Sequence, residues 1–204
     1  MWLFPHREPR RPQATPEPDA EYVRRAYDRA IDWYKVAEAK AQLLLTVNGL
    51  LVTVYFAVLT GKAGPADRAV RQVGVGAGIF AIVSAAAVIG ATGCAAGALW
   101  SRHTGNIKEA FPRLAVEPAD PGSYRPEVLW YFGHIAHLDG DAAARMIGGA
   151  DRRFEVTALS YNLVNLSHVV LRKHQFVNLG WALTATAIVS LVLAGAALLI
   201  QVQL

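Results

Sequence analysis

Hydrophobic positions gather in three long stretches of the chain. Residues 41–61, 72–101 and 174–204 contain no Asp, Glu, Lys or Arg. As helices that rise about 1.5 Å per residue, all three are long enough to cross the roughly 30 Å of hydrocarbon in a bilayer. The pattern predicts an all-α membrane protein with three transmembrane helices.

A helical pattern runs into the first of these spans without interruption. Asp19 suits a helix N-cap, and residues 19–40 then repeat an apolar position every three or four residues. No glycine or proline follows until Gly49. We therefore predict one long helix, with 19–40 outside the membrane and 41–61 inside it.

A similar pattern precedes the third span. Its apolar positions alternate three and four residues apart, as in a coiled-coil seam, and Lys173 is the only polar member. The seam consists of Val156, Leu159, Leu163, Leu166, Val170, Lys173 and Val177. It leads into the span 174–204 without a proline, so a second long helix is predicted to enter the membrane from the same side. We expect both helices to join the rest of 102–173 in a helical bundle.

The other segments have the composition of loops and short helices. Residues 1–18 contain five prolines and are expected to be an extended or disordered leader, without the apolar core of a cleaved signal peptide. Residues 62–71 are predicted to be a short loop between the first two spans. Within 102–173, prolines break up the first part, and a short helix at 141–147 ends at a glycine pair, Gly148–Gly149, which suits a hinge.

The distribution of basic residues predicts the orientation in the membrane. Of 20 Lys and Arg residues, eight lie in 1–40, three in 62–71, nine in 101–176 and none after the third span. Because basic segments flanking spans stay in the cytoplasm, we expect a cytoplasmic N-terminus and an external 62–71 loop in a bacterial inner membrane. We attribute the net charge of +4 to this asymmetry, and we expect no nucleic-acid partner.

Polar and small residues within the spans are candidates for helix contacts or for a pore. Asn48 lies near the middle of the first span, with Thr46 and Thr53 on either side. An amide in lipid needs a partner, so Asn48 is predicted either to make an interhelical hydrogen bond or to line a pore with the two threonines. Glycines spaced four apart in 72–101, such as Gly93 and Gly97, favour close helix approach and a homo-oligomer.

The sequence shows no grouping of residues that is typical of an enzyme active site. Cys94 is the only cysteine, and we find no grouped nucleophile, base and orienting residue. His134 and His137 can share a helical face as metal ligands, but a packed cluster of imidazoles and aromatic rings is the interpretation we favour. We expect no enzymatic activity, no metal and no cofactor.

Three segments resemble a known family in order along the chain. Residues 33–49, WYKVAEAKAQLLLTVNG, resemble the W-x-x-x-A-[DE]-x-K-A-x-x-L-L signature of the Pycsar transmembrane effector family. Residues 131–136, YFGHIA, and residues 163–175 resemble its later segments. The resemblance implies a bacterial antiphage effector that senses a cyclic pyrimidine mononucleotide, cUMP or cCMP, and impairs the inner membrane, causing abortive infection.

The resemblance and the needs of such a ligand together give the candidate site. A cyclic mononucleotide carries one negative charge and a flat base, so basic and aromatic side chains are expected around it. The candidates are Trp33, Glu38, Lys40, Tyr131, Phe132, His134, Arg145, Arg152 and Lys173. Glu38 and Lys40 do not face each other on a helix, so we predict that Glu38 pairs with Lys173 or Arg172 on the other long helix. The alternative function is a membrane-anchored scaffold whose seam recruits a protein partner without sensing a nucleotide.

Overall fold

The computed structural model describes residues 19–60, 74–100 and 109–203, and every regular element among them is helical. The elements in chain order are α1 (Ala20–Thr60), α3 (Val75–Leu99), η1 (Pro121–Ser123), η2 (Pro126–Val128), α5 (Phe132–Ile135), α6 (Gly140–Gly148) and α7 (Arg152–Gln203). The all-α prediction is confirmed. The predicted leader at 1–18 and the predicted loop at 62–71 lie outside the described residues.

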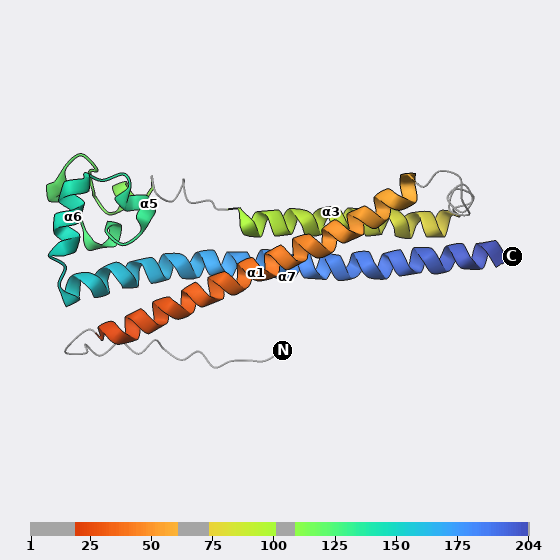
Figure 1. The fold of residues 1–204 in the computed structure, drawn as a ribbon, viewed down its shortest axis with the longest axis horizontal. Helices are drawn as coiled ribbons and strands as arrows, with labels where there is room; N and C mark the ends of the chain where they lie inside the picture. The colour runs from red at the N-terminus through yellow and green to blue at the C-terminus, as the bar shows by residue number, and fades with distance from the viewer. Residues whose placement is uncertain (1–18, 61–73, 101–108, 204) are drawn as a thin grey trace, which may run out of the picture.

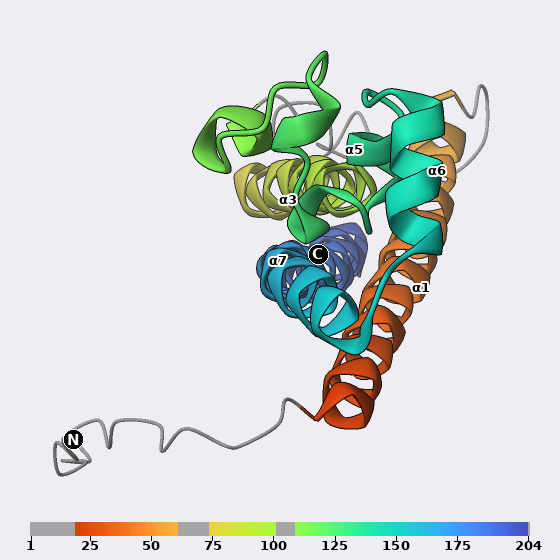
Figure 2. The same cartoon turned by 90° about the vertical axis from the view of Figure 1, so that its left-hand side faces the viewer.

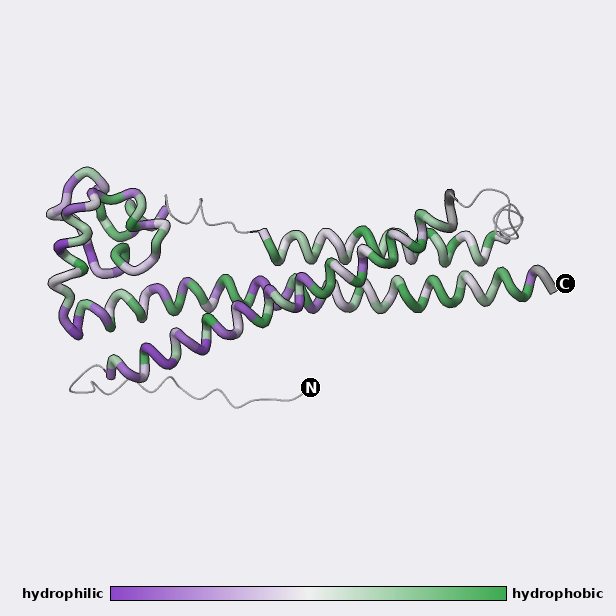
Figure 3. Tube along the Cα trace, viewed as in Figure 1, coloured by the Kyte–Doolittle hydropathy of each residue, from purple (hydrophilic) through white to green (hydrophobic). Residues whose placement is uncertain are grey.

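Helix α3 lies alongside the second half of α7, and α1 crosses both helices at an angle (Figure 1). Helices α1 and α7 run in the same direction, and α3 runs against them. Each of the three is long and apolar enough to cross a membrane, which confirms the prediction of three spans. Hydrophobic residues predominate where all three are adjacent, and polar residues predominate at the end where α1 and α7 begin (Figure 3). We call this polar end, comprising residues 20–40, 109–150 and 152–173, the head.

Helices α1 and α7 pass from the head into the apolar region without a break, as predicted. Each is started by an aspartate: Asp19 Oδ1 accepts a hydrogen bond from Tyr22 N at 3.2 Å, and Asp151 Oδ1 accepts one from Phe154 N at 2.7 Å. Helix α7 has 52 residues. At about 1.5 Å per residue it is roughly 78 Å long, more than twice the hydrocarbon thickness of a bilayer.

The three apolar helices approach one another closely at Gly180 of α7. A Cβ added there would lie 2.3 Å from Leu44 Cδ2 of α1 and 3.2 Å from Cys94 Cβ of α3. The absence of a side chain lets the three helices converge at this level. The close approach predicted for glycines of 72–101 is found at some of them: a Cβ added at Gly90 would lie 3.1 Å from Leu183 Cδ1, and one added at Gly97 would lie 3.4 Å from Phe176 Cε1, both of α7. A Cβ added at Gly93 would meet nothing within 4 Å.

Two hydrogen bonds between helices lie inside the apolar region. Asn48 Nδ2 donates to Thr184 Oγ1 at 2.9 Å, and Ser84 Oγ donates to the carbonyl oxygen of Ala187 at 2.6 Å. Asn48 and Thr184 are almost fully buried. Of the two alternatives for Asn48, the structure therefore shows the interhelical hydrogen bond.

The two threonines predicted to accompany Asn48 lie on another face of α1. Thr46 and Thr53 are exposed, and their hydroxyls donate to backbone carbonyls of their own helix, those of Gln42 and Gly49. The structure does not bring them together with Asn48. Their predicted role in lining a pore stays a prediction.

Residues 109–150, which we call the insertion, form a small domain with its own core (Figure 2). The buried core consists of Phe111, Val116, Tyr124, Val128, Leu129, Ala142 and Ala143. Phe154 of α7 packs against this core, and Asn162 Nδ2 of α7 donates to the Glu127 carbonyl oxygen at 3.2 Å. The insertion is thereby fixed to the beginning of α7. Helix α6 ends at Gly148, and α7 follows at Arg152 after a short turn.

The convergence at Gly180 predicts a clear contrast between two glycines. Gly180→Ala pushes a methyl group against Leu44 and Cys94, both buried, so we expect a loss of roughly 1–3 kcal/mol in unfolding free energy. For a chain of this size that is a fall of about 3–10 °C in melting temperature, measured in detergent micelles. Gly93→Ala is the matched control and should leave the melting temperature unchanged or slightly raised. Equal effects of the two substitutions would contradict the packing described here.

Candidate functional site

Lys173 and Glu38 form an ion pair between α7 and α1 where both helices leave the head. Lys173 Nζ lies 2.8 Å from Glu38 Oε1, and the side-chain exposures are 7% for Lys173 and 36% for Glu38. Lys173 Nζ also donates to Tyr34 Oη at 3.0 Å and lies 4.1 Å from the centre of the Tyr34 ring. The predicted cross-helix pair of Glu38 with Lys173 is thus confirmed.

The hydrogen bonds of this pair shift the pKa values of Glu38 and Lys173 in the directions that favour their charged forms. The hydrogen bond from Lys173 holds the pKa of Glu38 below its ordinary value, against the opposing effect of burial. For Lys173, burial alone would lower the pKa, but the hydrogen bonds to Glu38 and Tyr34 outweigh it and the pKa is raised. Both side chains are therefore ionised near neutral pH, and the seam position that looked anomalous in the sequence is an ammonium buried against α1.

Two neighbouring aromatic residues of the insertion face α1. Trp130 meets Tyr27 edge to face, with ring centres 5.8 Å apart. The next residue, Tyr131, is close enough to Tyr34 that its pKa is raised by burial and, secondarily, by the Tyr34 hydroxyl. The site around Lys173 is therefore built from all three segments that resemble the Pycsar family: the first in α1, the second in the insertion and the third in α7.

A second ion pair joins α1 and α7 at the far end of the head. Arg24 donates from Nε and Nη2 to the two carboxylate oxygens of Glu155, a two-pronged arrangement. The Arg24 side chain is largely exposed, and the Glu155 side chain is a quarter exposed. The hydrogen bonds from Arg24 lower the pKa of Glu155. The two long helices are thus tied by charge at both ends of the head.

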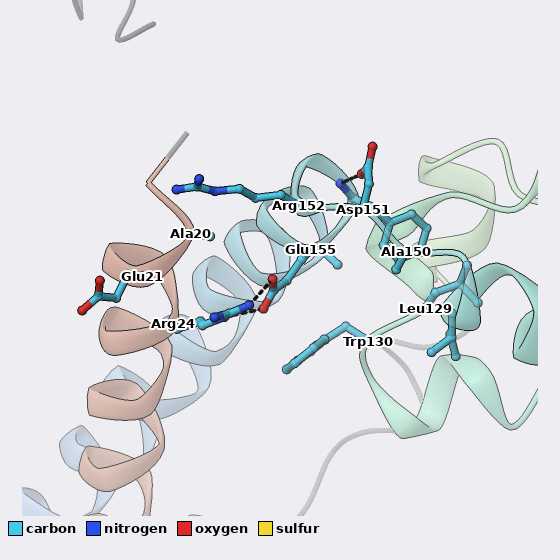
Figure 4. A pocket seen from close by; sticks show the side chains of 12 residues that line it. Ala20, Glu21, Arg24, Leu129, Trp130, Ala150, Asp151, Arg152 and Glu155 are labelled. Atoms are coloured by element: carbon cyan, nitrogen blue, oxygen red, sulfur yellow. Dashed lines mark hydrogen bonds and ion pairs between the residues drawn. The ribbon is translucent and has the colours of Figure 1, made fainter. Parts of the chain in front are cut away.

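A cleft opens beside this second pair (Figure 4). It has a volume of about 700 Å³ and lies where the first turns of α1 and α7 meet the insertion. Its lining residues are Ala20, Glu21, Arg24, Leu129, Trp130, Ile147, Ala150, Asp151, Arg152, Phe154, Glu155 and Ala158. This volume falls within the usual range of about 300–1,000 Å³ for small-molecule sites.

The predicted site residues divide among several places. Glu38, Tyr131 and Lys173 come together as described, and Arg152 lines the cleft. Trp33 lies on a different side of α1, edge to face with His174 at 5.8 Å, in a separate groove between α1 and α7. The structure does not gather the nine candidates into one pocket.

Three further candidates are solvent-exposed and one is buried. Lys40 and Arg145 are exposed, and Phe132 is 73% exposed. His134 is 5% exposed, inside the insertion, with its ring edge to face with Tyr131 at 5.2 Å. Burial, and then the nearby His137, lowers the pKa of His134, so the imidazole is neutral. This supports the packing interpretation of the two histidines. In the ranges 19–60, 74–100 and 109–203, no three His, Cys, Asp or Glu side chains are placed to hold a metal.

Arg24 and Glu155 were not identified from the sequence. A weak signal for Arg24 exists, because Arg24, Tyr27, Tyr34 and Glu38 fall within an arc of roughly 80° at 100° per residue on one helix face. Glu155 carries no such signal, since its partner is 131 positions away in the sequence.

Comparison with known proteins gives one match. A family model described as a Pycsar effector protein domain matches residues 22–201, nearly the whole chain. The matched range includes all three long helices and the head. No curated protein and no solved structure matches the chain.

Replacing Glu38 should destabilise the protein more than replacing Lys173 does. Glu38→Ala leaves a buried ammonium with only Tyr34 beside it, whereas Lys173→Met leaves a carboxylate that water can reach. Breaking a fully buried pair costs about 3–5 kcal/mol, and because Glu38 is a third exposed we expect about 1–3 kcal/mol for Glu38→Ala and less for Lys173→Met. Unfolding in detergent measures both. Lys35→Met, which removes an exposed lysine 3.8 Å from Asp32, is the control and should change stability by less than about 0.5 kcal/mol.

The same pair predicts a dependence of stability on pH. Because the pKa of Glu38 is lower in the folded protein than its ordinary 4.5, the pair's contribution is complete above that value and is lost as pH falls through the lowered pKa. Between about pH 5 and pH 3 the melting temperature of the wild type should fall more steeply than that of Glu38→Gln. Parallel curves for the two proteins would show that Glu38 contributes nothing through its charge.

Proposed function

The chain belongs to the Pycsar effector family, as an antiphage membrane protein, and on that basis we propose that its head binds a cyclic pyrimidine mononucleotide, cUMP or cCMP, and that binding impairs the bacterial inner membrane. We place the head and the N-terminus in the cytoplasm, where a cyclase would release such a messenger during infection. The proposal requires no catalytic step by this protein.

The observation that carries the proposal is the continuity of α1 and α7. Each is a single helix that begins in the head and ends near the far end of its apolar segment. Because a helix without proline or a break is stiff, a change in how the two helices pack in the head alters their packing in the membrane. A ligand that binds in the head thus has a mechanical route to the bilayer.

The contacts that hold α1 to the rest of the head are of a size that a ligand can overcome. They include the Arg24–Glu155 pair, the edge-to-face contact of Tyr27 with Trp130, and the Lys173–Glu38 pair. The exposed ion pair and the aromatic contact contribute about 1 kcal/mol each, and the partly buried Lys173–Glu38 pair contributes about 1–3 kcal/mol. To change the ratio of two arrangements of the head from 1:99 to 99:1, a ligand must bind one of them about 5.5 kcal/mol more strongly than the other. A ligand with a Kd of about 1 μM has a total binding free energy of about 8 kcal/mol. A micromolar ligand that favours one arrangement is therefore sufficient.

In the part of the chain that the structure describes, polar side chains between the three long helices are hydrogen-bonded to neighbouring helices, which favours several copies acting together. Asn48, Thr184 and Ser84 are buried and engaged in hydrogen bonds between the helices. Opening a path through one bundle would break these bonds in lipid. We propose instead that homo-oligomers form, and that exposed polar positions such as Thr46 and Thr53 line the space between copies.

The scaffold alternative is less well supported by the head. Of the predicted seam, Leu159, Lys173 and Val177 are buried within the chain, and Lys173 is bound to α1. The other four seam residues are half-buried, so only part of the seam is open to a protein partner.

Membrane potential provides the test. In inside-out vesicles from cells expressing the protein, the cytoplasmic side faces the medium, so added cUMP or cCMP should reach the head and collapse a respiration-driven potential reported by a voltage-sensitive dye. Right-side-out vesicles exclude the charged nucleotide and should keep their potential, which tests the orientation as well. If the protein is confirmed in the vesicles and neither nucleotide lowers the potential in either orientation, the proposal is wrong.

A further inference from the structure

The cleft between the starts of α1 and α7 contains a guanidinium whose hydrogen-bond donors are not engaged. Among its carboxylates, Glu155 binds Arg24 and Glu21 binds Arg25 at 2.9 Å, while Asp151 accepts the neutral Phe154 N–H and keeps its charge. Arg152 also lines the cleft, and within the described residues it makes no hydrogen bond or ion pair, although its charge contributes to lowering the pKa of Glu155. Arg152 therefore has charged hydrogen-bond donors left for a ligand.

The walls of the cleft add a flat apolar surface and two helix ends. Leu129, Phe154 and the Trp130 indole line one side, and Tyr27 holds the indole edge to face at 5.8 Å. Figure 4 shows the indole directed toward the Arg24–Glu155 pair, while Arg152 extends toward Ala20. Because α1 and α7 both begin here, the positive ends of two helix dipoles also border the cleft.

The position of the cleft decides between a soluble anion and a lipid headgroup. Arg152 precedes the start of the third span by 22 residues of uninterrupted helix, which is about 33 Å along α7. A phosphate of the bilayer surface does not reach that far. The anion that Arg152 suits is therefore a small molecule in solution.

We propose that this cleft is the nucleotide site of the head, with the phosphate of the cyclic mononucleotide on the Arg152 guanidinium and the base on the Trp130 indole. The inference rests on the proposed function and adds a location to it. The bound phosphate lies beside Arg24 and competes with Glu155 for it. Loss of the Arg24–Glu155 pair frees the start of α1 from the start of α7, which is the change that the continuous helices carry to the membrane.

Binding measured by calorimetry on the purified full-length protein in nanodiscs tests the assignment. Arg152→Gln should weaken binding of cUMP or cCMP roughly 10- to 100-fold, because a charge-assisted hydrogen bond to phosphate is lost. Arg153→Gln is the matched control: Arg153 is the next residue of the same helix, exposed and outside the cleft lining, and affinity should stay within about twofold. Glu155→Gln should tighten binding several-fold, since Arg24 loses its competing carboxylate.

Neutral nucleosides show whether Arg152→Gln removes a contact with the phosphate or disturbs the whole site. The neutral nucleosides uridine and cytidine lack the phosphate, so wild type should bind them more weakly than the cyclic nucleotides, and Arg152→Gln should lose that preference. If wild type binds a cyclic pyrimidine nucleotide and Arg152→Gln binds it as well as Arg153→Gln does, the cleft is not the site, although the proposed function stands. If wild type binds neither cUMP nor cCMP, the proposed function and this inference both fail.

Discussion

The ion pair between Lys173 and Glu38 constrains the rest of the structure. A buried ammonium at the edge of the apolar layer cannot be left without a partner, because hydration is lost there and nothing else in lipid replaces it. Helix α1 must therefore present Glu38 and Tyr34 to α7 at one particular height. Sliding either helix by one turn, about 5.4 Å, would separate the charges, so the pair fixes the register of α1 against α7 together with the Asn48–Thr184 hydrogen bond and the contact of Leu44 with Gly180.

The head consists of two parts that are held together differently. The insertion and the beginning of α7 share an apolar core in which Phe154 is embedded, and apolar burial is strong and without direction. Helix α1 is held to them mainly through charged and aromatic side chains at its surface, including Arg24, Tyr27 and Tyr34. Polar surface contacts are weaker and respond to competing ions. We therefore expect the boundary along α1 to rearrange more easily than the boundary between α7 and the insertion.

Sequence patterning was enough for the architecture but only for part of the site. The charge-free stretches and the unbroken periodicity around 38–42 predicted three spans and two continuous helices, since length and hydropathy are local properties of the chain. The partner of Glu38 was predictable because Lys173 was the one polar residue in an apolar seam. Arg24 with Glu155, and the close approach at Gly180, depend on how distant segments cross, which no local pattern encodes. Trp33 lies away from the Lys173 site, beside His174, because motif membership does not say which side of the helix faces the insertion. Its predicted role in binding stays a prediction.

The approach of three helices at Gly180 also determines how a displacement at one end of the long helices compares with the displacement at the other end. Gly180 lies two turns beyond Lys173 on the same side of α7, and there the backbone of α7 packs closely against Leu44 and Cys94. Measured along α7, about 37 Å separates Gly180 from Glu155, and about 31 Å separates it from Gln201. A point of close contact so near the middle acts as a fulcrum with arms of almost equal length. An outward swing of a few ångströms at the start of α1 or α7 would therefore arrive at the opposite membrane face as a displacement of similar size in the opposite direction.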